Sequence, residues 1–100
     1  GGDGVISVIA NEAPERFSEM VRLAMAGQFE RAREIYFELY PLMVANFLET
    51  NPIPVKAALA MMGLIEENIR LPLVPMSSGP REKMRRALAD LGLLPPAAEK

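Results

Sequence analysis

The segment from Gly4 to Ala10 constrains the fold of this 100-residue chain more than any other. Its sequence, GVISVIA, is rich in β-branched residues and almost continuously hydrophobic. This profile is typical of a strand that is buried on both faces of a parallel sheet. No second segment of this kind occurs in the chain. Because a lone strand leaves its backbone N–H and C=O groups unpaired, we expect its partner strands to lie upstream in a longer protein.

Helical patterns follow the strand. In the first, Phe17, Met20, Val21 and Ala24 recur at the spacing of one helix face. The predicted helices run from Asn11 to Gly27, from Gln28 to about Leu48, within Asn51 to Gly63, and from Ser78 or Gly79 to Leu91. The sequence therefore predicts four helices.

Glycines and prolines mark the ends of these helices. Gly27, Gly63 and Gly92 stand where a helix can close on a left-handed residue. Pro52 and Pro54 precede or begin the third helix, where the missing proline N–H costs little. Because proline also restricts the residue before it, this pair is expected to set the angle at which the third helix begins.

A single strand with its helix, followed by three more helices, indicates a mainly α chain that combines part of a barrel with a helical extension. We expect residues 1–27 to be the last βα unit of a (β/α)8 TIM barrel. Residues 28–94 would form a helical extension behind that barrel. Residues 95–100, PPAAEK, are expected to be a frayed tail.

Composition excludes several classes of function. The net charge of −2, with mixed signs, argues against a nucleic-acid-binding surface. The chain has no cysteine and no histidine, which removes disulfides, thiol nucleophiles, the usual zinc sites and histidine acid–base catalysis. Without a long apolar run or a signal-peptide pattern, we expect no contact with a membrane and a cytoplasmic location.

Lys56 is the candidate nucleophile, because a lysine in an apolar setting can form a Schiff base. It lies, however, in the first turn of a helix and not at the end of a barrel strand. We therefore favour a structural role for Lys56. Lys83 and Lys100 are expected to be solvated.

Other groups also have two interpretations. Glu66 with Glu67, and Glu12 with Glu15, could be paired carboxylates, but no metal ligand or base accompanies them, so solvated surface is expected. Tyr36 and Tyr40 could relay protons or simply pack. The seven methionines could line a binding groove, but most fall on helical stripes and indicate core. The GGDG stretch precedes the strand and resembles a phosphate loop only loosely.

Four motifs in fixed order carry a family resemblance: GGDGVISVIANEAP, NPIPVKAAL, GLIEENIRLPLVPMS and REKMRRALADLGLL. Together they resemble the C-terminal third of the dihydrodipicolinate synthase family. This family belongs with the pyruvate-dependent aldolases typified by N-acetylneuraminate lyase. The resemblance extends from Gly1 to about Leu94, and the NPIPVK segment favours the synthases over their lyase and aldolase relatives.

The resemblance implies a function for the complete protein. Family members condense pyruvate with aspartate semialdehyde on the route to lysine, using a Schiff-base lysine and a proton-relay tyrosine on earlier barrel strands and no cofactor. Among the residues of this chain, only Ile6 matches a site position, as a main-chain contact at the pyruvate pocket. We therefore expect no catalytic residue and no metal site here, and an inactive chain on its own. The family also implies a homo-oligomer, typically a tetramer.

Two alternatives stay open. One is another pyruvate-dependent aldolase of the same superfamily, and the other is a free-standing helical interaction module. The predicted strand distinguishes the module from the enzyme fragment, because a stand-alone module has no use for a single strand buried on both faces.

Overall fold

Four helices make up most of the computed structural model, which describes residues 1–95. A 3₁₀ helix, η1, spans Val8–Asn11, and the α-helices are α1 (Pro14–Met25), α2 (Phe29–Ala45), α3 (Ile53–Met61) and α4 (Ser78–Asp90). The prediction of four helices in a mainly α chain is confirmed. The ends differ from the predicted ones by a few residues, as at α1, which begins at Pro14 and not at Asn11.

The predicted strand is wrong for this chain. Residues 1–95 contain no strand, and the segment that should have formed one ends in η1. The backbone is still extended at Ser7 (φ −141°, ψ 142°), but then turns so that the Ser7 carbonyl accepts from the Ala10 N–H at 3.2 Å. A strand needs a neighbouring strand for its N–H and C=O groups, and without one the polypeptide satisfies part of them within itself.

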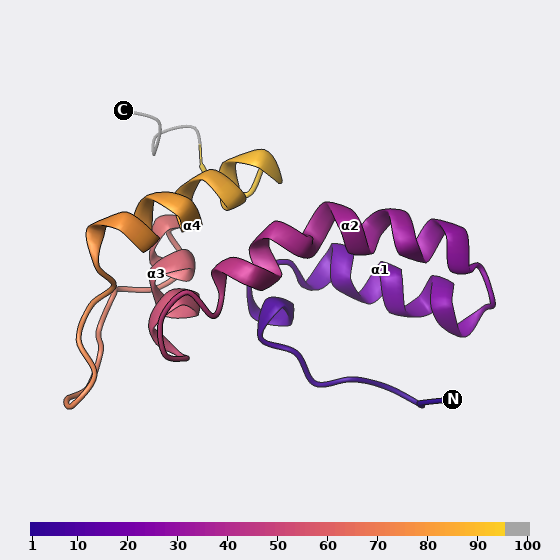
Figure 1. Ribbon diagram of the computed structural model, residues 1–100, viewed down its shortest axis with the longest axis horizontal. Helices are drawn as coiled ribbons and strands as arrows, with labels where there is room; N and C mark the ends of the chain where they lie inside the picture. The colour runs from indigo at the N-terminus through magenta and orange to yellow at the C-terminus, as the bar shows by residue number, and fades with distance from the viewer. Residues whose placement is uncertain (96–100) are drawn as a thin grey trace.

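Two groups of helices share α2 (Figure 1). The antiparallel helices α1 and α2 lie side by side at one end, and α3 and α4 gather around the last part of α2 at the other. η1 lies at the junction, in contact with α1, α2 and α3. The N-terminal segment runs away from η1 along the underside of the helices, as Figure 1 shows.

One apolar core connects these parts. It is built from the inward faces of η1 and all four helices, together with one residue between η1 and α1 and one of the connection before α4. Its buried members are Ile9, Ala13, Phe17, Ile35, Leu39, Leu42, Ala45, Ile53, Ala57, Ala58, Met76, Met84, Ala87 and Leu88. The core therefore holds the helical part together without a sheet beneath it.

Three helices end in the same way. Gly27, Gly63 and Gly92 have φ values of +79°, +79° and +70°, and each is followed by a residue whose N–H bonds back five residues. These bonds run from Gln28 to Leu23 (2.9 Å), from Leu64 to Leu59 (3.0 Å) and from Leu93 to Leu88 (3.0 Å). Each satisfies a carbonyl that the helix end would otherwise leave open. The three predicted helix stops are confirmed.

Replacing Gly27 by alanine is expected to destabilise the chain by about 1–2 kcal/mol, the cost of a left-handed L-residue. A Cβ at Gly27 would meet no atom within 4 Å, so steric contact adds nothing to this cost. Gly79, within α4, has equally open surroundings and no left-handed φ, and Gly79→Ala should be neutral or stabilising by up to about 1 kcal/mol. Urea unfolding measures both, and equal effects would contradict the assignment.

No helix in the described part of the chain is long and apolar enough to cross a membrane. Of the predicted tail, only Pro95 falls within residues 1–95, so the expected fraying lies outside the described residues.

Candidate functional site

Ile6, the predicted pyruvate-pocket contact, lies in the N-terminal segment ahead of η1. Its side chain is fully exposed. Among residues 1–95, no hydrogen bond is made to its main-chain N–H or C=O. The main chain at Ile6 is therefore open to a ligand or to another segment of polypeptide. Among residues 1–95, no acidic, basic or hydroxyl side chain forms a hydrogen bond with Ile6.

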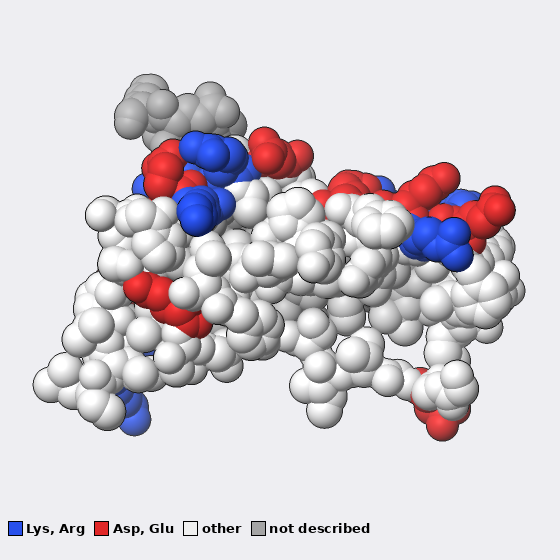
Figure 2. Space-filling model, viewed as in Figure 1, with Lys and Arg blue, Asp and Glu red and all other residues white. Residues whose placement is uncertain are grey.

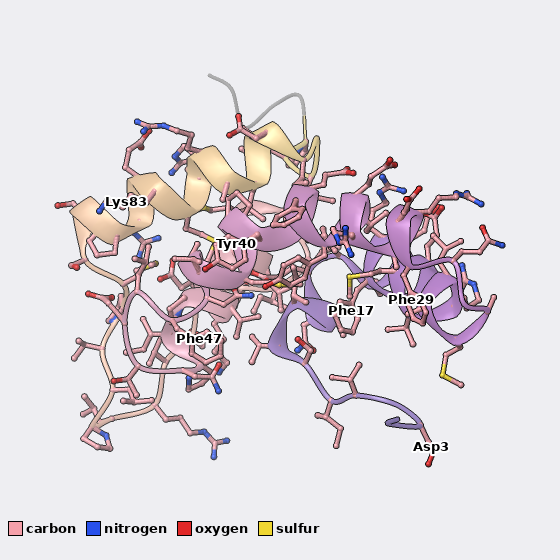
Figure 3. All side chains as sticks on the ribbon, turned by 45° about the vertical axis from the view of Figure 1, so that its right-hand side comes forward. Asp3, Phe17, Phe29, Tyr40, Phe47 and Lys83 are labelled. Atoms are coloured by element: carbon pink, nitrogen blue, oxygen red, sulfur yellow. The ribbon has the colours of Figure 1, made fainter. Side chains whose placement is uncertain are left out.

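A groove of about 590 Å³ separates this N-terminal segment from the α1–α2 pair. One wall is the segment itself, with Gly2 and Val5, and the other is formed by apolar side chains of both helices. Figure 2 shows that the middle of the visible face is mostly uncharged, whereas Lys, Arg, Asp and Glu gather along its upper edge, over α4 and over the right-hand part of the α1–α2 pair. In Figure 3, Phe29 lies at this groove-forming end of α2 and Asp3 points away from the helices. The groove suits an apolar polypeptide surface better than a charged metabolite.

Lys56 connects two segments of the chain through a hydrogen bond. Its Nζ donates to the main-chain carbonyl of Asn68 at 2.9 Å. Asn68 belongs to the connection between α3 and α4, which Figure 1 shows as a long arm extending from the body. The Lys56 side chain thus ties the start of α3 to this arm, in the structural role that the sequence favours, and it forms no salt bridge within residues 1–95.

The Glu66–Glu67 pair is split by the structure. Glu67 accepts two bonds from the Arg81 guanidinium, at 2.8 and 2.6 Å. Arg81 also donates to the Met76 carbonyl at 3.0 Å, and it holds the pKa of Glu67 below its ordinary value. Glu66 is exposed and reaches only Asn68. The two carboxylates therefore do not act together: Glu67 fixes the arm onto α4.

Glu12 is buried, so the prediction that it lies on a solvated surface is wrong. It is only 1% exposed, while Glu15 is exposed as expected. The cause is that α1 begins at Pro14, three residues after the predicted Asn11, which leaves Glu12 at the end of η1, in the interior of the junction. Asn46 at the end of α2, which the sequence analysis did not single out, is 0% exposed and lies against it. The apolar run that ends at Ala10, just ahead of Asn11 and Glu12, was the one available signal of this burial.

Burial raises the pKa of Glu12 to about 8, and the Asn46 side chain opposes part of this rise. No hydrogen bond joins the two side chains as they stand, and neither finds another partner among the described residues. Glu12 is therefore a protonated acid at neutral pH. It lies apart from Ile6, in the interior and not at the groove.

Tyr36 and Tyr40 pack on each other with ring centroids 5.8 Å apart, and Tyr36 also meets Phe37 edge-on at 5.4 Å. The two tyrosines are 40% and 48% exposed, and no hydrogen bond to either hydroxyl occurs among residues 1–95. The two tyrosines therefore pack against neighbouring rings with one edge exposed. Neither hydroxyl has a partner among residues 1–95 for a proton relay.

The remaining candidates do not converge on a site. Lys83 is exposed on α4, where Figure 3 labels it. Lys100 lies outside the described residues. Met76 and Met84 are buried in the core, whereas Met25 is exposed. The GGDG stretch is exposed and precedes η1. Within the part of the chain that the structure describes, no group of three or more acidic or other metal-binding side chains could hold a metal ion.

The sequence model of the dihydrodipicolinate synthetase family matches residues 1–91 of this chain. Among individual proteins, the chain is 55% identical over 94 residues to the 4-hydroxy-tetrahydrodipicolinate synthase of Methanocaldococcus jannaschii. The match covers 94% of this chain and 32% of the relative. The chain thus spans about a third of the length of the curated relatives that it matches.

Solved structures agree with the sequence comparison. The dihydrodipicolinate synthase of Thermotoga maritima is 53% identical and superposes with a TM-score of 0.91 over 94% of this chain and 32% of its own. The chloride-inhibited enzyme of Acinetobacter baumannii, solved with pyruvate, is 46% identical with a TM-score of 0.90, over 94% and 32% of the two chains. The helical arrangement described above is therefore that of one segment of these structures.

Proposed function

Because this chain belongs to the dihydrodipicolinate synthetase family, we propose that it is the C-terminal segment of an enzyme that condenses pyruvate with aspartate semialdehyde. The observation that carries the proposal is the 55% identity to a 4-hydroxy-tetrahydrodipicolinate synthase across nearly the whole chain. The solved relative that contains pyruvate supports the first substrate. Lysine biosynthesis and a cytoplasmic location follow from the same assignment.

In this enzyme, residues 1–27 would complete a (β/α)8 barrel and residues 28–94 would form the helical extension. The extended backbone before η1 supports this division, since it would become a strand once neighbouring strands supplied hydrogen-bond partners. The open main chain of Ile6 would then face the pyruvate pocket. The apolar groove beside it would be covered by the rest of the barrel.

The chain would supply binding and closure, not the covalent chemistry. In a class I aldolase a lysine amine condenses with the ketone of pyruvate and releases water. The Nζ of Lys56 is engaged with the Asn68 carbonyl, and Lys83 is exposed. Both are unsuited to that step, so the Schiff-base lysine would come from the preceding two-thirds of the enzyme.

A chimera tests this proposal. The chimera joins the first two-thirds of the Methanocaldococcus jannaschii relative to this chain and replaces the matching third of that enzyme. We expect the chimera to turn over pyruvate and aspartate semialdehyde, and the truncated relative without this chain to be inactive. A chimera that folds, by circular dichroism, but has no turnover would reject the proposal and leave the helical module as the alternative. Turnover of pyruvate with another aldehyde only would favour another aldolase of the superfamily.

The chain alone is expected to form no Schiff base. Incubation with pyruvate and borohydride, followed by mass spectrometry, should show no stoichiometric adduct, because Lys56 is bonded to a carbonyl and Lys83 is exposed. The chimera should form one adduct per chain under the same conditions. An adduct that maps to Lys56 in the isolated chain would contradict the structural role of that residue.

Homo-oligomerisation, with a tetramer as the expected form, belongs to the same proposal. The exposed aromatic side chains of α2 support it, since Tyr36, Phe37 and Tyr40 present a contiguous apolar surface. Sedimentation of the chimera, with and without Phe37→Asp, measures whether this face joins copies.

A further inference from the structure

Glu12 and Asn46 are the two polar residues buried among the described ones. Glu12 ends η1 just before α1, and Asn46 caps the C-terminus of α2. The two residues are separated by the whole of the α1–α2 pair in sequence, and the fold brings them together at the junction with α3. They are therefore well placed to connect the segment that carries Ile6 with the helical body.

All four polar side-chain atoms of this pair are buried and without a hydrogen-bond partner among residues 1–95. A buried polar group without a partner is costly, and a buried unpaired charge is more so. A protonated carboxyl and a carboxamide are complementary, because each offers one N–H or O–H donor and one C=O acceptor toward the other. A direct contact between the two side chains would pair all of these groups.

The charged groups around the pair do not offer an alternative partner. Among the acids and bases of the surrounding elements are Glu15 and Arg16 on α1, Glu34 and Glu38 on α2, Glu49 beyond α2, and Lys56 on α3. Arg16 binds Glu19 and Glu38, Glu49 accepts from Ser77, and Lys56 donates to Asn68. Glu15 and Glu34 are exposed. None of them contributes to the pKa of Glu12, which burial raises and Asn46 partly lowers.

We propose that Glu12 and Asn46 form a neutral acid–amide pair that joins η1 to the end of α2, and that ionisation of Glu12 opens this contact. In the closed pair the Glu12 hydroxyl donates to the Asn46 carbonyl, and the Asn46 amide donates to the Glu12 carbonyl. Loss of the proton removes the first bond and leaves a carboxylate in an apolar interior, where only the Asn46 amide can solvate it. The junction is thus a switch that responds to alkaline pH.

One other occupant would give different behaviour. A monovalent cation could instead hold an ionised Glu12 with the Asn46 oxygen, and the carboxyl would then be charged at neutral pH.

Carbon-13 NMR of the carboxyl groups in this chain, labelled at glutamate, distinguishes these cases. At pH 6.5 in potassium buffer we expect one glutamate carboxyl carbon at the position of a protonated acid while the others are ionised. That signal should be absent from Glu12→Gln and retained in Glu15→Gln. Its titration should have a midpoint near pH 8, and in Asn46→Leu this midpoint should move upward, since the only group that solvates the anion is gone.

Three outcomes would overturn the proposal. The first is that every glutamate carboxyl titrates below pH 6. The second is a Glu12 signal that moves when potassium is replaced by a bulky organic cation, which indicates a cation site. The third is a protonated Glu12 whose midpoint does not change in Asn46→Leu, which excludes Asn46 as its partner. If Asn46→Leu does not fold, Asn46→Ala offers the same measurement with less added volume.

Discussion

Raising the pH from 5 to 9 is expected to lower the free energy of unfolding of this chain by on the order of 4 kcal/mol, because each tenfold change in proton affinity is worth about 1.4 kcal/mol. The pKa of Glu12 is about 8 in the folded chain and 4.5 as a reference for the unfolded one. At pH values between 4.5 and 8, Glu12 of the folded chain holds a proton that the unfolded chain has lost. The stabilisation is therefore complete below pH 4.5 and disappears as the pH rises through 8.

Urea unfolding at a series of pH values measures this effect. The Glu12→Gln variant should match the parent chain near pH 5, exceed it in stability at pH 9, and show a flat profile between the two. Glu15→Gln, which changes an exposed neighbour, should keep the slope of the parent. If the parent profile is flat from pH 5 to 9, Glu12 is not the buried acid that the structure describes.

Glu67 has the opposite effect on stability, and it does so at acidic pH. Its pKa lies below the ordinary 4.5 because Arg81 binds the carboxylate, so its contribution is present above pH 4.5 and is lost as the pH falls through the lowered value. Stability should therefore pass through a maximum near pH 5. Because Glu67 and Arg81 are partly solvated, we expect the acidic limb to be shallower than the alkaline one.

Truncation of Leu39 to alanine is expected to destabilise the chain by about 2–5 kcal/mol. Leu39 is 0% exposed in α2, at the centre of the core that joins both groups of helices. The lost transfer free energy and the cavity left behind both contribute, and neighbouring helices cannot close fully over the gap.

Phe37→Ala is the matched control for this prediction. It removes a larger side chain from the same helix, two residues away, but Phe37 is 62% exposed. We expect a cost of under about 1 kcal/mol, since little of the ring leaves water on folding. Urea midpoints at constant slope give the comparison. An equal or larger loss in Phe37→Ala would mean that copies of the isolated chain already cover the exposed face of α2 in solution.

The features that the sequence predicted well depend on neighbours along the chain. A helix is decided by side chains three and four residues apart, and its end by one residue that can take a left-handed φ. For this reason the four helices and the stops at Gly27, Gly63 and Gly92 agree with the structure. The motifs NPIPVKAAL and GLIEENIRLPLVPMS likewise identified the family, because that comparison needs only residue order.

The features that only the tertiary structure decided depend on segments far apart in the chain. The Gly4–Ala10 segment has the composition of a strand, but a strand requires hydrogen-bond partners, and in their absence the chain turns into η1. Glu12 looks like a surface carboxylate on a helix, yet the late start of α1 and the end of α2 enclose it beside Asn46. Local sequence preferences determine which residues become helical, whereas pairing, burial and the pKa of Glu12 depend on which distant segments the fold brings into contact.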